Sequence, residues 1–189
     1  SQHFKGWQSQ AVINDALHKI GGFIGAEYGE VIFTSGATES NNMAIFSLCS
    51  LKERFFERSR ILVSPIEHKC VLNSVAFWAP KFGLEIEYLK LSQEGLIDLD
   101  YLSSTISDDV LFCTVGAVNN EIGAIQNLDE ISRRLRSKGI FFHSDLAQAP
   151  KTIDCIKSSE LVDVASFSGH KVGGPPGIGC LFISASLQQ

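Results

Sequence analysis

The chain has 189 residues, of which 44% are hydrophobic and 20% are charged, so it can bury a sizeable core and its composition argues against global disorder. Sixteen Lys and Arg residues against 21 Asp and Glu residues give a net charge of −5, which disfavours an electrostatic nucleic-acid binder. Since no apolar run approaches the roughly 18 residues of a membrane span, we expect neither nucleic acid nor a membrane among the partners.

Helices and strands alternate along the whole chain. In chain order the sequence predicts helix Gln8–Ile24, strand Glu30–Thr34, helix Thr38–Leu51, strand Arg60–Val63, helix Lys69–Trp78, strand Glu85–Leu89, helix Asp98–Ile106, strand Val110–Val115, helix Leu128–Lys138, and strands Ile140–Ser144, Val164–Ser168 and Gly179–Ile183. The helices are predicted from apolar residues at helical spacing and the strands from short β-branched or alternating runs. Asp98 is the expected N-cap of its helix. The alternation predicts an α/β fold with a mostly parallel sheet, and the length suits one domain.

Cysteine usage argues against a disulfide framework and a structural zinc site. The five cysteines are Cys49, Cys70, Cys113, Cys155 and Cys180. Their number is odd and no pair has C-x-x-C spacing, which argues against both. Cys70, Cys113, Cys155 and Cys180 lie in or beside predicted helices and strands and are best explained as small buried hydrophobic residues. We therefore expect a reducing compartment, either the cytoplasm or, in a eukaryote, the mitochondrial matrix.

Polar residues follow five of the predicted strands at the point where each strand ends. These clusters are Ser35-Gly36-Ala37-Thr38, Glu67-His68, Asn119-Asn120-Glu121, Asp145 with Gln148, and Ser168-Gly169-His170-Lys171. Ligands of open α/β sheets bind beyond the carboxyl ends of the strands. The clusters are therefore predicted to converge on one edge of the sheet and to form a cofactor site there.

The first cluster, Ser35-Gly36-Ala37-Thr38, precedes a predicted helix. Glycine lets a ligand approach the backbone, and a helix N-terminus presents N–H groups to an anion. Because neither a Walker A loop nor a G-x-G-x-x-G fingerprint is present here, the expected anion is a single phosphate or carboxylate. The alternative is an ordinary helix N-cap formed by a Ser or Thr side chain.

Two residues at other strand ends could supply cofactor chemistry. Lys171 lies in a glycine-rich loop and could form a Schiff base with a carbonyl, although such a lysine is usually just exposed. Asp145 ends an apolar strand and could hold a ring nitrogen protonated, as a pyridinium cofactor requires, or could serve as a helix cap or core hydrogen-bond partner. Taken alone, His68 is better explained as a hydrogen-bonded loop residue than as a catalyst.

Two other chemistries fit the sequence less well. His143 and Asp145 are two residues apart on a strand and point the same way, as metal ligands can, but no third ligand is evident and we expect no metal. Ser168, His170 and Asp145 could be drawn as a hydrolase triad, but a G-x-S-x-G nucleophile elbow is absent.

Five motifs occur in a fixed order, each at a strand end. They are Phe33-Thr34-Ser35-Gly36-Ala37-Thr38-Glu39-Ser40-Asn41-Asn42, Glu67-His68-Lys69, Val118-Asn119-Asn120-Glu121-Ile122-Gly123, Asp145-x-x-Gln148 and Ser166-Phe167-Ser168-Gly169-His170-Lys171. Together they resemble the motifs of the cysteine desulfurases, class V aminotransferase-like enzymes that use pyridoxal 5′-phosphate (PLP). The resemblance implies the large domain of a fold-type I PLP-dependent transferase, with a seven-stranded mixed sheet flanked by helices and an antiparallel last strand.

The resemblance also implies roles for the site residues. Lys171 would form the covalent link to the cofactor and later move protons, and Asp145 would pair with the pyridine nitrogen. His68 would stack on the ring and could shuttle a proton, while Asn120 and Gln148 would hydrogen-bond around the phenolic oxygen. The phosphate would be held by the backbone of Ala37 and by the side chains of Thr38, Ser168 and His170.

For the whole protein the resemblance implies conversion of L-cysteine to L-alanine, with the sulfur held as an enzyme persulfide for iron–sulfur cluster or thio-cofactor synthesis. The family works as a homodimer, with a possible sulfur-acceptor protein as partner. Since family members are considerably longer, residues 1–189 are expected to be the PLP-binding large domain, without the N-terminal segment and the C-terminal small domain. No cysteine matches the family's nucleophile, so the chain alone is expected to be inactive.

Two alternative functions stay open. A selenocysteine lyase, or a class V aminotransferase that acts on a small amino acid, would use the same motifs. A catalytically inactive remnant would also keep them and serve only as a scaffold or partner. A turnover assay and the presence of a nucleophilic cysteine in the parent gene discriminate among these functions.

Overall fold

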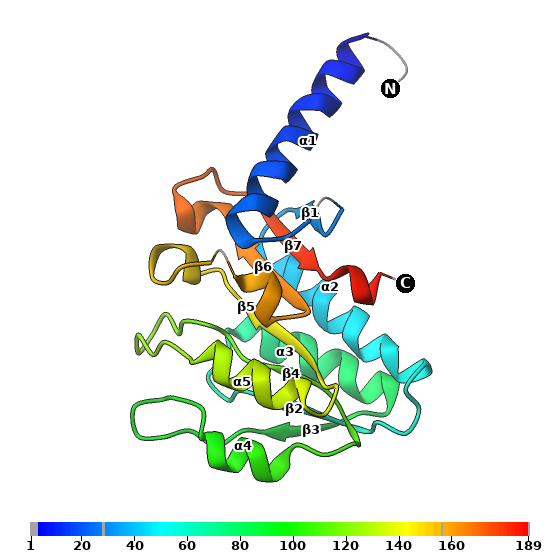
Figure 1. The fold of residues 1–189 in the computed structure, drawn as a ribbon, viewed down its shortest axis with the longest axis vertical. Coiled ribbons are helices and arrows are strands. Elements are labelled where there is room, and N and C mark those ends of the chain that lie inside the picture. Colours follow the sequence, from blue (N-terminus) through cyan, green and yellow to red (C-terminus); the bar gives the residue numbers. More distant parts are fainter. Residues whose placement is uncertain (1–3, 28, 156, 189) are drawn as a thin grey trace.

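A seven-stranded sheet with strand order β1-β7-β6-β5-β4-β2-β3 organises the molecule (Figure 1). The computed structural model describes residues 4–27, 29–155 and 157–188. The strands are β1 (Val31–Thr34), β2 (Arg60–Val63), β3 (Glu85–Tyr88), β4 (Val110–Thr114), β5 (Phe141–Asp145), β6 (Val164–Ser168) and β7 (Gly179–Ile183). All seven predicted strands are present, which confirms the α/β fold expected from the sequence.

Strand direction follows the mixed pattern that was expected. β2 pairs in parallel with β3 and β4, and the parallel ladder continues through β5 to β6. β7 is antiparallel to both of its neighbours, β6 and β1. The parallel strands therefore end at the same edge of the sheet, the edge at which the polar clusters were predicted to meet.

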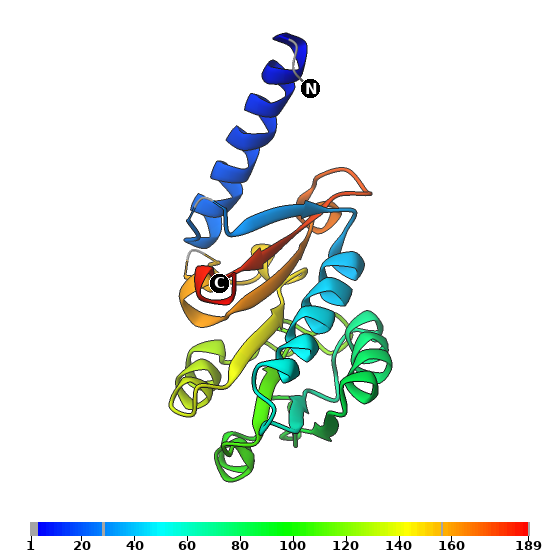
Figure 2. The ribbon, with the colours of Figure 1, turned by 90° about the vertical axis from the view of Figure 1, so that its right-hand side faces the viewer.

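Helices cover both faces of the sheet (Figures 1 and 2). They are α1 (Phe4–Ile24), α2 (Ala37–Ser50), α3 (Lys69–Trp78), α4 (Leu99–Thr105), α5 (Leu128–Arg136) and the short α6 (Ser158–Leu161). α2 and α3 pack on one face and α4 and α5 on the other, while α1 extends away from the body beside β1. Among the described residues, no helix combines the length and the apolar character that a membrane crossing requires.

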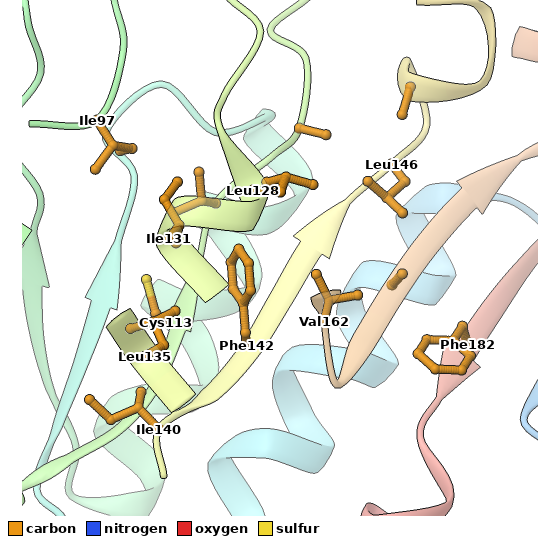
Figure 3. Packing of buried hydrophobic residues seen from close by; sticks show 14 of the residues in the cluster. Ile97, Cys113, Leu128, Ile131, Leu135, Ile140, Phe142, Leu146, Val162 and Phe182 are labelled. Atoms are coloured by element: carbon orange, nitrogen blue, oxygen red, sulfur yellow. The ribbon is translucent and has the colours of Figure 1, made fainter. Parts of the chain in front are cut away.

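The core on the α5 face is built around Phe142 of β5. Figure 3 shows its ring packed against Leu128, Ile131 and Leu135 of α5, with Cys113 of β4 close by. Phe142 has 1% of its surface exposed, so its burial contributes about 1.5–3 kcal/mol to folding. This packing fixes the position of β5 relative to α5, and with it the position of the residues that follow the strand.

A close backbone approach fixes the start of α2 against the sheet. A Cβ on Gly179 of β7 would lie 2.6 Å from both the Cα of Gly36 and the carbonyl oxygen of Phe167, which is not possible without a shift of the chain. Only glycine therefore lets the β1–α2 turn lie directly on β7. The close approach places the α2 N-terminus beside the carboxyl end of β6.

Candidate active site

A cavity of about 500 Å³ opens at the carboxyl ends of the parallel strands. Residues from all five predicted polar clusters line it, so the predicted convergence is confirmed. All nine predicted site residues are among them, namely Ala37, Thr38, His68, Asn120, Asp145, Gln148, Ser168, His170 and Lys171. The volume lies in the range of small-molecule sites.

Asp145, the last residue of β5, is held in a fixed orientation by two donors. The Asn41 side-chain Nδ2 donates to Oδ2 at 2.7 Å, and the backbone N–H of Ala147 donates to Oδ1 at 2.9 Å. Burial raises the pKa of Asp145, while these two hydrogen bonds and the nearby His68 lower it. The arrangement suits a carboxylate that must meet a cationic or proton-bearing ring atom at one defined place.

The start of α2 presents backbone to the cavity. The N-cap is Gly36, which has no capping side chain, so the alternative that a Ser or Thr side chain caps this helix is wrong. An uncapped N-terminus leaves N–H groups available to an anion. Across the cavity, Ser168 Oγ and His170 Nδ1 lie 2.9 Å apart, so one side chain of the pair can donate to an anion while the other orients it.

Lys171 lies in a single helical turn, Gly169–Val172, directly after β6. Its side chain is half-buried and lines the cavity that Asp145 also lines. Among the described residues, no ion pair involves its ammonium group. The amine is therefore free to react with a ligand in the cavity.

His68 is the N-cap of α3. Its Nδ1 accepts a hydrogen bond from the backbone N–H of Cys70 at 3.2 Å and lies 2.9 Å from the Cys70 Sγ. The cap leaves the exposed imidazole at the rim of the cavity, where a flat ligand ring could lie against it. Both interpretations of His68 are thus compatible, since the hydrogen-bonded loop residue is also positioned at the site.

Three residues of the site were not assigned a role from the sequence. Asn41 is fully buried on α2 and binds Asp145, Glu67 is buried in the cavity wall, and the half-buried Cys70 lines the cavity. The interpretation of Cys70 as a buried hydrophobic residue is wrong, whereas Cys113, Cys155 and Cys180 are buried as expected. Helical spacing places Asn41 on the same face as Ala44 and Leu48, and this could have identified it as a buried polar residue.

The structure argues against both alternative chemistries. Asp145 is bound by Asn41 and Ala147 rather than His170, so Ser168 and His170 form a pair without the acid of a hydrolase triad. His143 is buried between Thr114 and Ser166, and burial lowers its pKa to about 3, so it is a neutral core residue. Within the described residues, no group of three or more His, Cys, Asp or Glu side chains could hold a metal ion.

Comparison with known sequences identifies the family. The sequence profile described as Aminotransferase class-V matches residues 1–189, so the chain belongs to the class-V aminotransferases. A cysteine desulfurase IscS of Rickettsia bellii is 42% identical over 181 residues, which cover 96% of this chain and 43% of that protein. A probable mitochondrial cysteine desulfurase of Dictyostelium discoideum is 41% identical over 183 residues, 96% of this chain and 40% of that protein.

Solved structures agree with the sequence comparison. A NifS-like protein superposes with a TM-score of 0.92 at 30% identity, over 99% of this chain and 51% of that one. The structure described as SspA in complex with cysteine gives a TM-score of 0.88 at 36% identity, over 97% of this chain and 52% of that one. The fold is therefore that of the fold-type I enzymes, and the chain spans less than half the length of the curated relatives it matches.

Proposed function

We propose that residues 1–189 are the cofactor-binding large domain of a PLP-dependent cysteine desulfurase. The observation that carries the proposal is one cavity that joins a fixed carboxylate, Asp145, a reactive amine, Lys171, and an uncapped helix N-terminus at Gly36. These are the three groups that a pyridinium nitrogen, an aldehyde and a phosphate respectively require. The names of the relatives, cysteine desulfurases from bacteria and a mitochondrion, support the same activity.

The donor set suits the chemical groups of PLP. Its phosphate fits the backbone at Ala37, the hydroxyl groups of Thr38 and Ser168 and the imidazole of His170, since local N–H and hydroxyl donors outweigh a distant net negative charge. Asn120 and Gln148 supply amide groups for the phenolic oxygen, and His68 supplies a flat face for the ring. When bound, PLP acts as an electron sink for the substrate carbon next to the amine.

The residues of the chain supply binding and proton transfer. Lys171 would hold the cofactor covalently, and its amine would be placed to take the substrate Cα proton. Asp145 would keep the ring nitrogen protonated, and its two donors prevent the carboxylate from turning away. His68 covers one face of the site and can return a proton to the product from the rim.

The proposed substrate is L-cysteine, and the proposed products are L-alanine and a sulfur atom bound as a persulfide to a cysteine of the whole enzyme. We further propose a homodimer, a sulfur-acceptor protein as partner, and the cytoplasm or the mitochondrial matrix as location. The names of the relatives favour this function over a selenocysteine lyase, an aminotransferase or an inactive remnant.

The first test is covalent capture of PLP by Lys171. Mixing the chain with PLP should give a visible absorption band, and borohydride should fix the label on the peptide that carries Lys171, as read by mass spectrometry. Lys171→Ala should lose the label, whereas Lys69→Ala, beside His68 at the start of α3, should keep it. Labelling that persists unchanged in Lys171→Ala would contradict the assignment.

A further inference from the structure

Glu67 places a second carboxyl group beside Asp145. It follows β2 and has 7% of its surface exposed. Its Oε1 accepts a hydrogen bond from the backbone N–H of Gly116, which follows β4. From the same loop, Asn119 donates to the Ile66 carbonyl at 2.7 Å. These two bonds tie the loops together and hold the Glu67 side chain in the cavity wall.

The Glu67 carboxyl group fills the space over Gly116. A Cβ at Gly116 would lie 3.1 Å from Oε2 and 3.4 Å from Oε1, which is tighter than ordinary contact. Oε2 is buried and has no hydrogen-bond partner among the described residues. A buried anionic oxygen without a donor is unfavourable, whereas a protonated carboxyl oxygen carries no charge and can itself donate.

Two buried carboxyl groups at one site do not ionise equally. Asp145 receives two hydrogen bonds and Glu67 receives one, so the negative charge is better stabilised on Asp145. The pKa of Glu67 is raised to about 8, chiefly by burial and in smaller part by the charge of Asp145, while the Gly116 hydrogen bond acts to lower it. The other titratable groups around Glu67 are Cys113 on β4, His68 and Cys70 at the start of α3, and Lys171, His170 and Glu39 across the cavity.

We propose that Glu67 is a positioning residue that carries a proton on Oε2 at neutral pH and so leaves Asp145 as the single anion in this wall of the cavity. The neutral acid still holds the Gly116 loop through Oε1, so it fixes geometry without adding charge. Ionised Glu67 would place a second negative charge beside Asp145 and would raise the proton affinity of the ring nitrogen. The inference depends on the proposed function only for the identity of that ring.

The test uses the ligand-free chain, so its outcome is independent of PLP binding. Infrared difference spectra between pH 7 and pH 10 should show loss of a protonated-carboxyl band with a midpoint near pH 8. Glu67→Gln should abolish this band, and Glu67→Asp, which keeps an acid, should retain one. Glu39→Gln is the matched control and should keep the band, because Glu39 lines the same cavity but a hydrogen bond from Ser35 lowers its pKa.

Asp145→Asn tests which carboxyl group holds the proton. The band should persist in Asp145→Asn and its midpoint should move to lower pH, since a neighbouring negative charge is removed. A band that is lost in Asp145→Asn and survives in Glu67→Gln would overturn the proposal, as would the absence of any protonated carboxyl group at pH 7. If Glu67→Gln fails to fold, NMR of the wild-type chain labelled with ¹³C at the Glu carboxyl carbons decides, because one resonance should titrate near pH 8.

In the PLP-loaded chain, loss of the Glu67 proton should also change the visible absorption of the cofactor. The pH dependence of the visible band should contain a step near pH 8 in the wild type that Glu67→Gln lacks. If PLP fails to bind while the infrared band behaves as expected, the proposed function is contradicted and the proton on Glu67 is not.

Discussion

Asp145 should act through its charge rather than through packing. Asp145→Asn keeps the shape, and the Asn41 amide can turn to present its Oδ1, which is buried and lacks a partner among the described residues. The fold should therefore survive, with little change in melting temperature. In a chain that carries the complete active site, turnover should fall by about 100-fold or more, since electrostatic stabilisation of this kind contributes a few kcal/mol.

The measurement separates kcat from KM for Asp145→Asn. The fall should be in kcat, because the role of the carboxylate is to stabilise charge during the reaction. Asp100→Asn on α4, which does not line the cavity, is the control and should change neither parameter. Turnover close to normal in Asp145→Asn would refute the electron-sink role of this carboxylate.

The residues that the sequence predicted at the site share one property, which is that each belongs to a polar cluster at a strand end. Glu67 belongs to such a cluster too, yet its role depends on Gly116, which is 49 residues away in sequence. Cys70 was missed because apolar environments are the usual ones for cysteine, and its contact with Asn41 depends on how α2 packs against α3. Long-range contacts of this kind leave no periodic pattern in the sequence.

At the scale of the elements, Arg60 links three strands at the edge of the sheet opposite the cavity. From the start of β2 its guanidinium binds Glu87 of β3 and, at 2.7 Å, Asp109 just before β4. Arg60→Met keeps the aliphatic stem and should lower the free energy of unfolding by about 1–3 kcal/mol, since hydrogen bonds to charged groups contribute that much when partly buried. Urea unfolding measures the loss.

Lys138→Met is the control for Arg60→Met. The ion-pair partner of Lys138, Asp108, is 90% exposed, so Lys138→Met should lower the free energy of unfolding by only about 0–1 kcal/mol.

The ion pair of Arg60 should also make stability depend on pH. The Arg60 guanidinium holds the pKa of Asp109 below its usual range. The contribution of Asp109 to the free energy of unfolding is therefore fully present above about pH 4, and it is lost as the pH falls through the folded-state pKa of Asp109. The loss of unfolding free energy in Arg60→Met, relative to the wild type, should therefore be smaller at pH 2 than at pH 7. An equal loss at the two pH values would mean that this ion pair contributes nothing.

The bounds of the elements were predicted best where both ends have a chemical marker. α3 runs from Lys69 to Trp78 as expected, with the His68 cap before it and Pro80 after it. Asp98 caps α4 as predicted, through hydrogen bonds at 3.0 and 2.9 Å. α1 begins at Phe4 rather than Gln8, and the apolar side chains of its first turns, Phe4 and Trp7, are exposed instead of packed in the core.

For the whole molecule, the sequence predicted the number of strands but not their order. Alternating helices and strands predict a parallel sheet, yet β7 is antiparallel and lies between β1 and β6. The antiparallel direction of β7 was expected only through the family resemblance, and its place between β1 and β6 was not predicted, since pairing between strands far apart in sequence has no local marker. The convergence of five strand ends was predictable, because it follows from parallel direction alone.

The whole chain should not release sulfide from L-cysteine by itself. Desulfuration needs a thiolate that reaches the substrate sulfur. Among the described cysteines Cys70 alone lines the cavity, and it is fixed at the first turn of α3 by contacts with His68 and Asn41. Burial raises the pKa of the Cys70 thiol, so little thiolate is present at neutral pH.

The assay compares PLP-loaded chain with free PLP, with reductant present, and measures sulfide and alanine. Both products should stay at the level of the blank, and Cys70→Ala should change nothing. Cys49→Ala is the control for a cysteine that is fully buried in the core. Release well above the blank that is abolished in Cys70→Ala and retained in Cys49→Ala would contradict the prediction and identify Cys70 as the nucleophile. Among the described cysteines, only Cys70 lines the cavity and can meet a substrate bound at Lys171 and Asp145.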